Sequence, residues 1–339
     1  MTDNPVLADV SRGGSVESAH RGALAVFDAD GACVLALGDI DRPVFPRSAV
    51  KGIQALALME SGAADRFDLT QGEIALACSS HSGEPAHAET AAHMLKKAGR
   101  TLACLECGTH WPMNEAAAHA LARSGREPSA LHNNCSGKHA GFVCAAVAMA
   151  EDPQGYVGAD HPLQREVTAA LETVFELDLS GAPRGIDGCA IPTFAMPLKA
   201  MATGFARFGA GVGFQPARGK AIRRIRQACA AEPFMVAGSG RFDTRIMTAL
   251  RERAFTKTGA EGVYCAALPE LGLGIALKID DGATRASEAA MASLIAKYLP
   301  LGAAESAVIA VAMDAPIHNR NGAIVGHVRP AEGLRRALA

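Results

Sequence analysis

The chain has 339 residues, of which 49% are hydrophobic and 20% charged, and its formal net charge is −2. This composition excludes intrinsic disorder, and the lack of a basic excess argues against nucleic acid as a partner. Mean hydropathy is +0.12 and no run of 18 or more apolar residues occurs, so neither a transmembrane helix nor membrane association is expected. The length suffices for one large or two modest domains.

The cysteine and lysine counts are informative. Nine cysteines are an odd number, and the opening Met1-Thr-Asp-Asn-Pro lacks the basic and apolar regions of a signal peptide. We therefore expect reduced thiols in a soluble, cytoplasmic protein. Among the 33 basic residues only 9 are lysine, whereas 24 are arginine, so lysine is the scarce cation.

The N-terminal region is predicted to form a β-hairpin. Residues 24–27 and 33–37 are apolar runs joined by Asp-Ala-Asp-Gly, which favours a turn. A loop with two prolines then leads into a helix of about five turns over residues 48–64. The apolar run 74–78 predicts a buried strand that enters the polar loop Ser79-Ser80-His81-Ser82-Gly83.

The middle of the chain is predicted to be mainly helical, and the C-terminal region returns to strands. Six helices are expected, over residues 85–98, 113–123, 137–150, 162–176, 197–207 and 217–231. A short helix over 243–253 follows, and then a second hairpin formed by 263–268 and 273–279. The last predicted helix covers residues 286–298.

Strands at both ends of the chain indicate an α+β fold. We expect one antiparallel sheet built from both chain ends, covered by helices, with a mainly helical region between. A parallel, doubly wound sheet is disfavoured because strands and helices do not alternate. The predicted sheet part is 1–75 and 235–339, and the predicted helical part is 76–234, together one compact catalytic unit.

Ser48-Ala-Val-Lys51 is the first candidate for catalysis. On a helix, residues three apart share a face, so the lysine amine can reach the serine hydroxyl and take its proton. The alternative is a helix cap followed by a surface lysine. Arg47 precedes this motif and is a candidate for binding a substrate carboxylate, the alternative being a surface arginine.

Lys257-Thr-Gly follows late in the chain. An early Ser-x-x-Lys and a late Lys-Thr-Gly are two of the three signatures of serine β-lactamases and penicillin-binding proteins. The third signature, Ser-x-Asn, is missing, and the loop at Ser80 is the nearest polar substitute.

Cys135 and Cys189 are candidate zinc ligands. Each lies in a segment dense in polar side chains, and Lys138, His139 or Asp187 could complete a tetrahedral site. Bonding preference alone favours His139, because a lysine must first lose its proton. The alternative is that the two cysteines are unrelated buried thiols.

In combination, these motifs resemble the Rhizobium-type L-asparaginases, the asparaginase II family. The similarity covers about residues 5–330. The matching segments are Arg12-Gly-Gly, Val16-Glu-Ser-x-His20-Arg-Gly, Pro43-Val-Phe-Pro-Arg-Ser48-Ala-Val-Lys51, Cys78-Ser-Ser80-His-Ser-Gly-Glu, Asn134-Cys-Ser-Gly-Lys-His139, Asp187-Gly-Cys189, Gly238-Ser-Gly-Arg-Phe-Asp243 and Lys257-Thr-Gly-Ala-Glu-Gly262.

The resemblance implies a β-lactamase-like fold and an amidohydrolase that converts L-asparagine and water to L-aspartate and ammonia without an organic cofactor. It also implies two Ser–Lys pairs, Ser48 with Lys51 and Ser80 with Lys257. We favour Ser48 as the acylated serine, because a helix N-terminus would stabilise negative charge there. The family further suggests a homodimer.

The resemblance also implies a zinc ion with three protein ligands, which are Cys135, Lys138 and Cys189. His139 is then assigned to substrate binding, near Arg47 and Asp187. Two alternatives stay open. One is a β-lactamase-like serine hydrolase that acts on glutamine or another amide, and the other is a non-catalytic zinc or thiol sensor.

Overall fold

The computed structural model describes residues 4–339, which form two compact units. The sheet unit consists of residues 1–49, 196–210 and 256–339, and the helical unit of residues 50–195 and 211–255. Each unit is built from segments that are distant in the sequence.

These bounds differ from the predicted division at residues 75/76 and 234/235. Residues 50–75 and 235–255 belong to the helical unit, and residues 196–210 to the sheet unit. No described helix is long and apolar enough to span a membrane.

The sheet unit contains an eight-stranded sheet in the order β11-β12-β1-β2-β10-β9-β8, with β3 paired to β2. Its strands are β1 Val6–Arg12, β2 Ser15–Asp28, β3 Cys33–Leu37, β8 Phe255–Thr258, β9 Val263–Leu268, β10 Leu273–Ile279, β11 Ala315–His318 and β12 Ile324–Pro330. The pairings of β1, β2 and β10 with their neighbours are antiparallel. The α+β class and the antiparallel sheet built from both chain ends are therefore confirmed.

Four helices and a short ribbon complete the sheet unit. The helices are α9 Leu198–Ala210, α13 Thr284–Tyr298, α14 Ala303–Met313 and α15 Glu332–Leu338, and the ribbon pairs β4 Pro43–Val44 with β7 Met196–Pro197. All six residues of β9 are buried, so both faces of the sheet are covered there. Helix α9 packs directly on β10, because a Cβ on Gly274 would lie 2.0 Å from the Ala202 carbonyl oxygen.

The helical unit contains eleven α-helices among the described residues. They are α1 Lys51–Gln54, α2 Leu56–Glu60, α3 Ala63–Arg66, α4 Gln71–Ala77, α5 Pro85–Lys97, α6 Glu115–Arg123, α7 Ser136–Ala148, α8 Pro162–Phe175, α10 Pro216–Ala231, α11 Pro233–Ala237 and α12 Phe242–Leu250. A short ribbon pairs β5 Arg184–Ile186 with β6 Pro192–Phe194. Helices α5 to α10 confirm the six helices predicted for the middle of the chain, although α9 among them belongs to the sheet unit.

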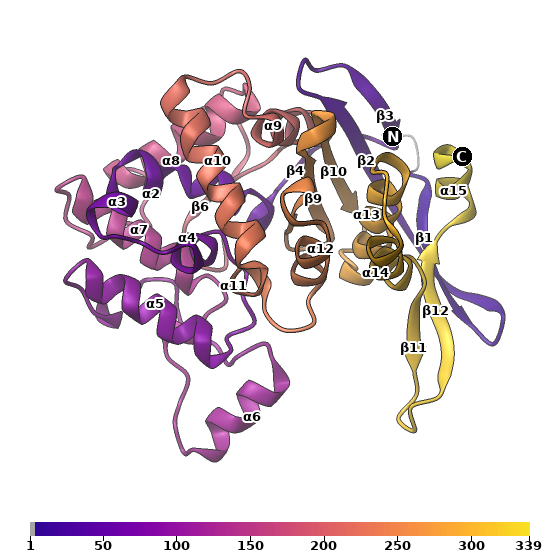
Figure 1. The fold of residues 1–339 in the computed structure, drawn as a ribbon, viewed down its shortest axis with the longest axis horizontal. Helices are drawn as coiled ribbons and strands as arrows, with labels where there is room; N and C mark the ends of the chain where they lie inside the picture. The colour runs from indigo at the N-terminus through magenta and orange to yellow at the C-terminus, as the bar shows by residue number, and fades with distance from the viewer. Residues whose placement is uncertain (1–3) are drawn as a thin grey trace. The chain divides into compact units, whose positions relative to one another are not determined.

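Helix α7 is the centre of the helical unit, where it contacts α2, α4 and α5 (Figure 1). Its first eleven residues are buried, and two glycines allow α4 to approach closely. A Cβ on Gly137 would lie 2.4 Å from the carbonyl oxygen of Leu76, and one on Gly141 would lie 3.1 Å from the Cβ of Ala77. This close packing brings the C-terminal end of α4 beside the N-terminal end of α7.

The strand predicted over residues 74–78 is wrong, because these residues belong to helix α4 and its C-cap. A run of five apolar residues fits a buried helix as well as a buried strand. The decisive signal is the capping box, in which Thr70 and Glu73 each accept a hydrogen bond from the other's backbone N–H.

The predicted continuous helix over 48–64 is also wrong. The segment forms a 3₁₀ turn, Arg47–Val50, followed by the three short helices α1, α2 and α3. Gly62 has a φ of +76°, which interrupts the segment before α3. Because Ser48 lies in a 3₁₀ turn and not at the start of a long helix, the helix dipole gives no reason to prefer it as nucleophile.

The helix predicted last in the chain exists as α13, but it is not the last element. Helix α14, the hairpin of β11 and β12, and helix α15 follow it. Strand β1 was not predicted either, and it lies between β12 and β2 in the sheet.

Candidate active site

The loop after α4 carries Ser79 and Ser80 into the interior of the helical unit. The Ser80 N–H donates to the Val236 carbonyl at 2.9 Å, and the His81 N–H donates to the Asn134 carbonyl at 3.2 Å. These two bonds tie the loop to α11 and to the segment before α7. The backbone at Ser80 is thus fixed from both sides.

Lys51 extends its side chain to this loop and is fully buried. Its Nζ donates to the Ser79 carbonyl at 2.6 Å, to Ser80 Oγ at 3.0 Å and to Cys135 Sγ at 3.1 Å. A lysine with all its hydration replaced by three fixed acceptors is held in one position. When it is neutral, the same amine can take the proton of a serine hydroxyl.

Cys135, Lys138 and Cys189 form a second buried group beside Lys51. Lys138 Nζ lies 2.9 Å from Cys189 Sγ, and both residues are buried. A hydrogen bond from Cys189, together with the positive charges of Lys51 and Lys138, holds the pKa of Cys135 well below its usual range despite burial. The same hydrogen bond and burial raise the pKa of Cys189. The two thiols titrate as a coupled pair, and the neighbouring amines of Lys51 and Lys138 favour a negative charge on it.

The charge on Lys138 follows from these neighbours. Burial lowers the pKa of Lys138, but the sulfurs of Cys189 and Cys135 outweigh this effect, and the pKa is raised. Asp187 adds a smaller contribution in the same direction. Its own Oδ1 accepts a hydrogen bond from the Gly188 N–H at 2.7 Å.

The donor chemistry of Cys135, Lys138 and Cys189 fits a zinc ion. Two sulfurs within hydrogen-bond distance of each other and an amine beside one of them offer three donors from one side. Among residues 4–339, no group of three or more His, Cys, Asp and Glu side chains could hold a metal. Lys138 would be the third donor to such a metal, and its amine would have to lose its proton to bind.

His139 follows Lys138 on α7 and is fully buried. Its Nδ1 lies 2.6 Å from the hydroxyl of Tyr156, and its Nε2 is buried without a partner among the described residues. Burial, and then the charges of Lys138 and Lys51, hold the pKa of His139 well below its usual range. The imidazole is therefore neutral.

His81 fixes the loop of Ser80 against α7, a role that the sequence did not reveal. The Gly83 N–H donates to His81 Nδ1 at 3.1 Å, so Nε2 carries the hydrogen and donates to Ser136 Oγ at 2.9 Å. Burial holds the pKa of His81 well below its usual range, which keeps this pattern intact at neutral pH. No motif marks His81 as special except its position beside Ser80.

The sheet unit carries the other candidate residues, which are Arg47, Ser48 and Lys257. Arg47 has a φ of +51°, a strained backbone for a non-glycine residue, and Ser48 directly after it is half-buried. Lys257 on β8 is fully buried, and its Nζ donates to the Thr258 carbonyl at 3.0 Å. Gly259 lies against the Arg47 turn, because a Cβ there would be 2.7 Å from the Pro46 carbonyl oxygen.

The predicted residues are thus collected into two groups. The helical unit brings Lys51, Ser80 and Cys135 into mutual reach and holds Lys138 beside Cys189. The sheet unit brings the segment of Arg47 and Ser48 beside the Lys257-Thr-Gly segment. In each predicted pair, one residue belongs to the sheet unit and the other to the helical unit. Ser48 and Lys257 are in the sheet unit, and their predicted partners Lys51 and Ser80 are in the helical unit. The hydrogen bond between Lys51 and Ser80 was not predicted.

Comparison with known proteins identifies the family of the chain. Residues 8–330 match the family model of L-asparaginase II, and the chain belongs to this family. It is accordingly an asparaginase-type amidohydrolase. No curated protein matches the sequence.

Two solved structures resemble the fold at a distance. A protein from Bacteroides dorei, provisionally described as a β-lactamase, is 16% identical and has a TM-score of 0.37, with 76% of this chain and 84% of that chain covered. A mutant of simvastatin synthase from Aspergillus terreus is 13% identical and has a TM-score of 0.38, with 76% and 86% covered.

Proposed function

We propose that the chain hydrolyses L-asparagine to L-aspartate and ammonia through an acyl-serine intermediate, with Lys51 as the general base. The observation that carries this proposal is the fully buried Lys51 amine at 3.0 Å from Ser80 Oγ, in a chain of the L-asparaginase II family. A buried amine beside a serine hydroxyl is the arrangement that a Ser–Lys proton transfer requires.

Ser48 is the proposed nucleophile. It is half-buried and follows the strained backbone of Arg47, whereas Ser80 is nearly fully buried and its N–H is occupied by the Val236 carbonyl. A substrate amide must reach the attacking oxygen, and backbone strain concentrates at such positions. Ser80, bonded to Lys51, is proposed to relay the proton.

The proposed chemistry has two halves. Neutral Lys51 takes the Ser48 hydroxyl proton by way of the Ser80 hydroxyl as Ser48 Oγ bonds to the side-chain amide carbon of asparagine. The resulting ammonium returns the proton to the departing nitrogen, which leaves as ammonia. Water then attacks the ester carbon, Lys51 accepts a water proton, and the proton passes to Ser48 as aspartate is released.

Substrate recognition is proposed for three further residues. Arg47 suits the α-carboxylate as a bidentate partner, and Asp187 suits the α-ammonium group. His139 offers a buried hydrogen-bond donor for a substrate oxygen. The proposed zinc at Cys135, Lys138 and Cys189 supplies, when bound, a fixed positive charge that orders its ligands and orients an anionic substrate.

The experiment is steady-state ammonia release from L-asparagine and from L-glutamine by the wild type, Ser48→Ala and Ser80→Ala, with mass spectrometry of the acyl adduct of a slow substrate. We expect wild-type turnover of asparagine above glutamine, and no adduct in Ser48→Ala. An adduct that persists in Ser48→Ala but not in Ser80→Ala would reverse the assignment of the nucleophile. Faster ammonia release from glutamine than from asparagine would overturn the proposed substrate.

Zinc is tested separately by elemental analysis of the purified protein. We expect about one zinc per chain in the wild type and a loss of that metal in Cys189→Ser. Cys144→Ser is the matched control, because Cys144 is also a buried thiol and donates only to the Met94 carbonyl at 3.5 Å. Equal metal content in all three proteins would refute this site.

A further inference from the structure

Tyr156 is a fully buried residue of the helical unit that no catalytic motif marks. It lies in the segment between α7 and α8, and its hydroxyl has two polar neighbours. The Glu106 N–H donates to this hydroxyl at 3.0 Å, and His139 Nδ1 lies 2.6 Å from it. The two rings meet edge to face, with centroids 5.4 Å apart.

A count of hydrogens decides the direction of the bond between Tyr156 and His139. A phenol has one hydrogen, and the Glu106 N–H already points at the oxygen as a donor. The oxygen could accept a second hydrogen bond, but the phenol hydrogen would then have no acceptor among the described residues. The phenol hydrogen therefore goes to His139 Nδ1, which is the unprotonated nitrogen. Burial raises the pKa of Tyr156, so the phenol keeps its hydrogen at neutral pH.

This hydrogen bond at Nδ1 determines the state of the other ring nitrogen, Nε2. With Nδ1 as acceptor, neutral His139 carries its hydrogen on Nε2. This Nε2–H donor is buried and has no partner among the described residues. A buried donor without an acceptor is costly, so its persistence points to an acceptor supplied by a ligand.

We propose that Tyr156 is a positioning residue, which fixes the tautomer of His139 so that Nε2–H is presented to an oxygen of the bound substrate. The inference rests on the proposed function, because the ligand is taken to be the amino-acid amide. A carbonyl or carboxylate oxygen fits this donor, whereas an amide NH₂ or an ammonium group does not. By fixing the tautomer of His139, Tyr156 thus determines that Nε2–H binds an acceptor oxygen of the substrate.

The surroundings of Tyr156 suit this role because they hold it on several sides. Gln164 Nε2 donates to the Tyr156 carbonyl at 2.9 Å, and the Gly155 N–H donates to Glu106 Oε1 at 2.7 Å. The ring also meets Phe142 of α7, with centroids 6.5 Å apart. A phenol held this firmly leaves the imidazole one orientation to accept its hydrogen.

The test is Tyr156→Phe in the full-length protein, with two measurements. Long-range ¹H–¹⁵N correlation spectra of histidine-labelled protein should show the Nε2–H tautomer of His139 in the wild type and its loss or mixture in Tyr156→Phe. The KM for L-asparagine should rise about tenfold, while kcat changes less than about threefold. Tyr264→Phe, which removes a buried phenol hydroxyl of the sheet unit, is the control and should leave both measurements unchanged.

A second variant separates the tautomer from simple packing. In His139→Gln the amide donor needs no tautomer to be fixed, so adding Tyr156→Phe should raise KM no further. An equal rise in KM in that background would overturn the proposal, as would a Tyr156→Phe protein with the wild-type tautomer and KM. If the wild type does not hydrolyse asparagine, the proposed function fails, and the spectra still decide whether Tyr156 fixes the tautomer.

Discussion

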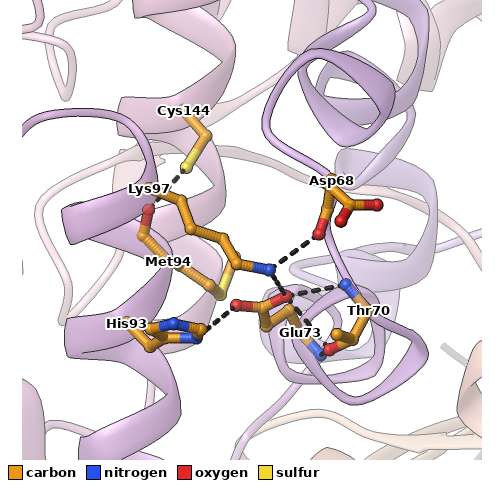
Figure 2. A network of polar contacts seen from close by, with 7 residues as sticks. All are labelled: Asp68, Thr70, Glu73, His93, Met94, Lys97 and Cys144. Atoms are coloured by element: carbon orange, nitrogen blue, oxygen red, sulfur yellow. Dashed lines mark hydrogen bonds and ion pairs between the residues drawn. The ribbon is translucent and has the colours of Figure 1, made fainter.

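The two ends of helix α4 bury polar groups in opposite ways. At its N-terminal end the carboxylate of Glu73 is enclosed by partners, as Figure 2 shows. At its C-terminal end Ser79 and Ser80 meet Lys51 and the segment of Cys135. Both regions belong to the helical unit, and both remove charged groups from water. Only in the Glu73 region does every buried polar side-chain atom have a hydrogen-bond partner among the described residues.

The Glu73 network is saturated. Its Oε2 accepts from Thr70 N–H at 2.7 Å, from Thr70 Oγ1 at 3.0 Å and from Lys97 Nζ at 2.8 Å, and its Oε1 contacts His93 Nδ1 at 3.0 Å. Lys97 Nζ also donates to the Asp68 carbonyl at 2.7 Å. Both carboxylate oxygens of Glu73 thus have partners among the described residues.

The Lys51 centre, by contrast, contains buried polar atoms that form no hydrogen bond with another described residue. Ser79 Oγ and His139 Nε2 are buried without a partner among residues 4–339. Buried polar groups are normally paired, so these two atoms are the ones in this centre that a ligand would complete. The comparison therefore assigns stability to one end of α4 and function to the other.

Lys51→Met has the largest expected effect and tests whether the Lys51 end of α4 serves function. Loss of the general base should lower kcat about a thousandfold. The melting temperature should also fall, because the Ser79 carbonyl and the Cys135 sulfur lose their buried donor, but the loss of turnover should dominate. Ammonia release and thermal unfolding measure the two quantities. Wild-type turnover in this variant would remove Lys51 from the mechanism.

Gly137→Ala tests whether the close approach of α4 to α7 links the stability of the Glu73 region to the function of the Lys51 centre. The new Cβ would lie 2.4 Å from the Leu76 carbonyl oxygen, so the helices must separate. We expect the free energy of unfolding to fall by about 3 kcal/mol, together with a loss of kcat. Gly219→Ala in α10 is the control, since its Cβ meets its nearest atom at 3.6 Å. Equal stability of the two variants would contradict the close approach.

Glu73→Gln should show the opposite pattern from Lys51→Met. The amide keeps the shape of the side chain but loses the charge that Lys97 and Thr70 face, which should lower the free energy of unfolding by about 2 kcal/mol. The kcat should stay within about twofold of wild type. Denaturant unfolding and ammonia release measure both, with the exposed Glu89→Gln on α5 as the control. A large fall in kcat would show that the network also serves catalysis.

The smallest expected effect is the pH dependence of that stability. Burial raises the pKa of Glu73, but the hydrogen bonds from Lys97 and Thr70 outweigh it, and the pKa is lowered. A lowered folded-state pKa means that the stability is present above the ordinary pKa of glutamate and is lost as pH falls through the folded-state value. The difference between wild type and Glu73→Gln should thus be constant above about pH 5 and shrink below about pH 4. A difference that grows on acidification would contradict this sign.

Much of the fold could be predicted from local signals. The turn Asp-Ala-Asp-Gly and the segment Pro269-Glu270-Leu271-Gly272 defined two hairpins, and both exist as β2–β3 and β9–β10. The run 74–78 could not be resolved by apolar content, and the overlooked pair Thr70 and Glu73 held the answer. Strands β11 and β12 form a local hairpin that the sequence analysis missed. Strand β12 also pairs with β1, some 300 residues earlier in the chain, and Val328 is buried against Val10 and Ala289, a long-range contact that no local pattern reveals.

The candidate site was predictable as a set of residue types but not as a set of contacts. Spacing suggested Ser48 for Lys51, whereas the contact between Lys51 and Ser80 depends on how α4 ends. Tyr156 gave no signal, because its partners Glu106 and His139 are 50 and 17 residues away. Such long-range hydrogen bonds follow from packing and not from motif.

The lysines of the chain divide sharply by burial. Lys51, Lys138 and Lys257 are among the largest fully buried side chains, whereas four lysines are exposed, namely Lys96, Lys199, Lys220 and Lys297. Reagents that couple to primary amines from solution will therefore reach the outer lysines first. The protein can thus be tethered to a support or labelled through its outer amines while the interior amines stay unmodified.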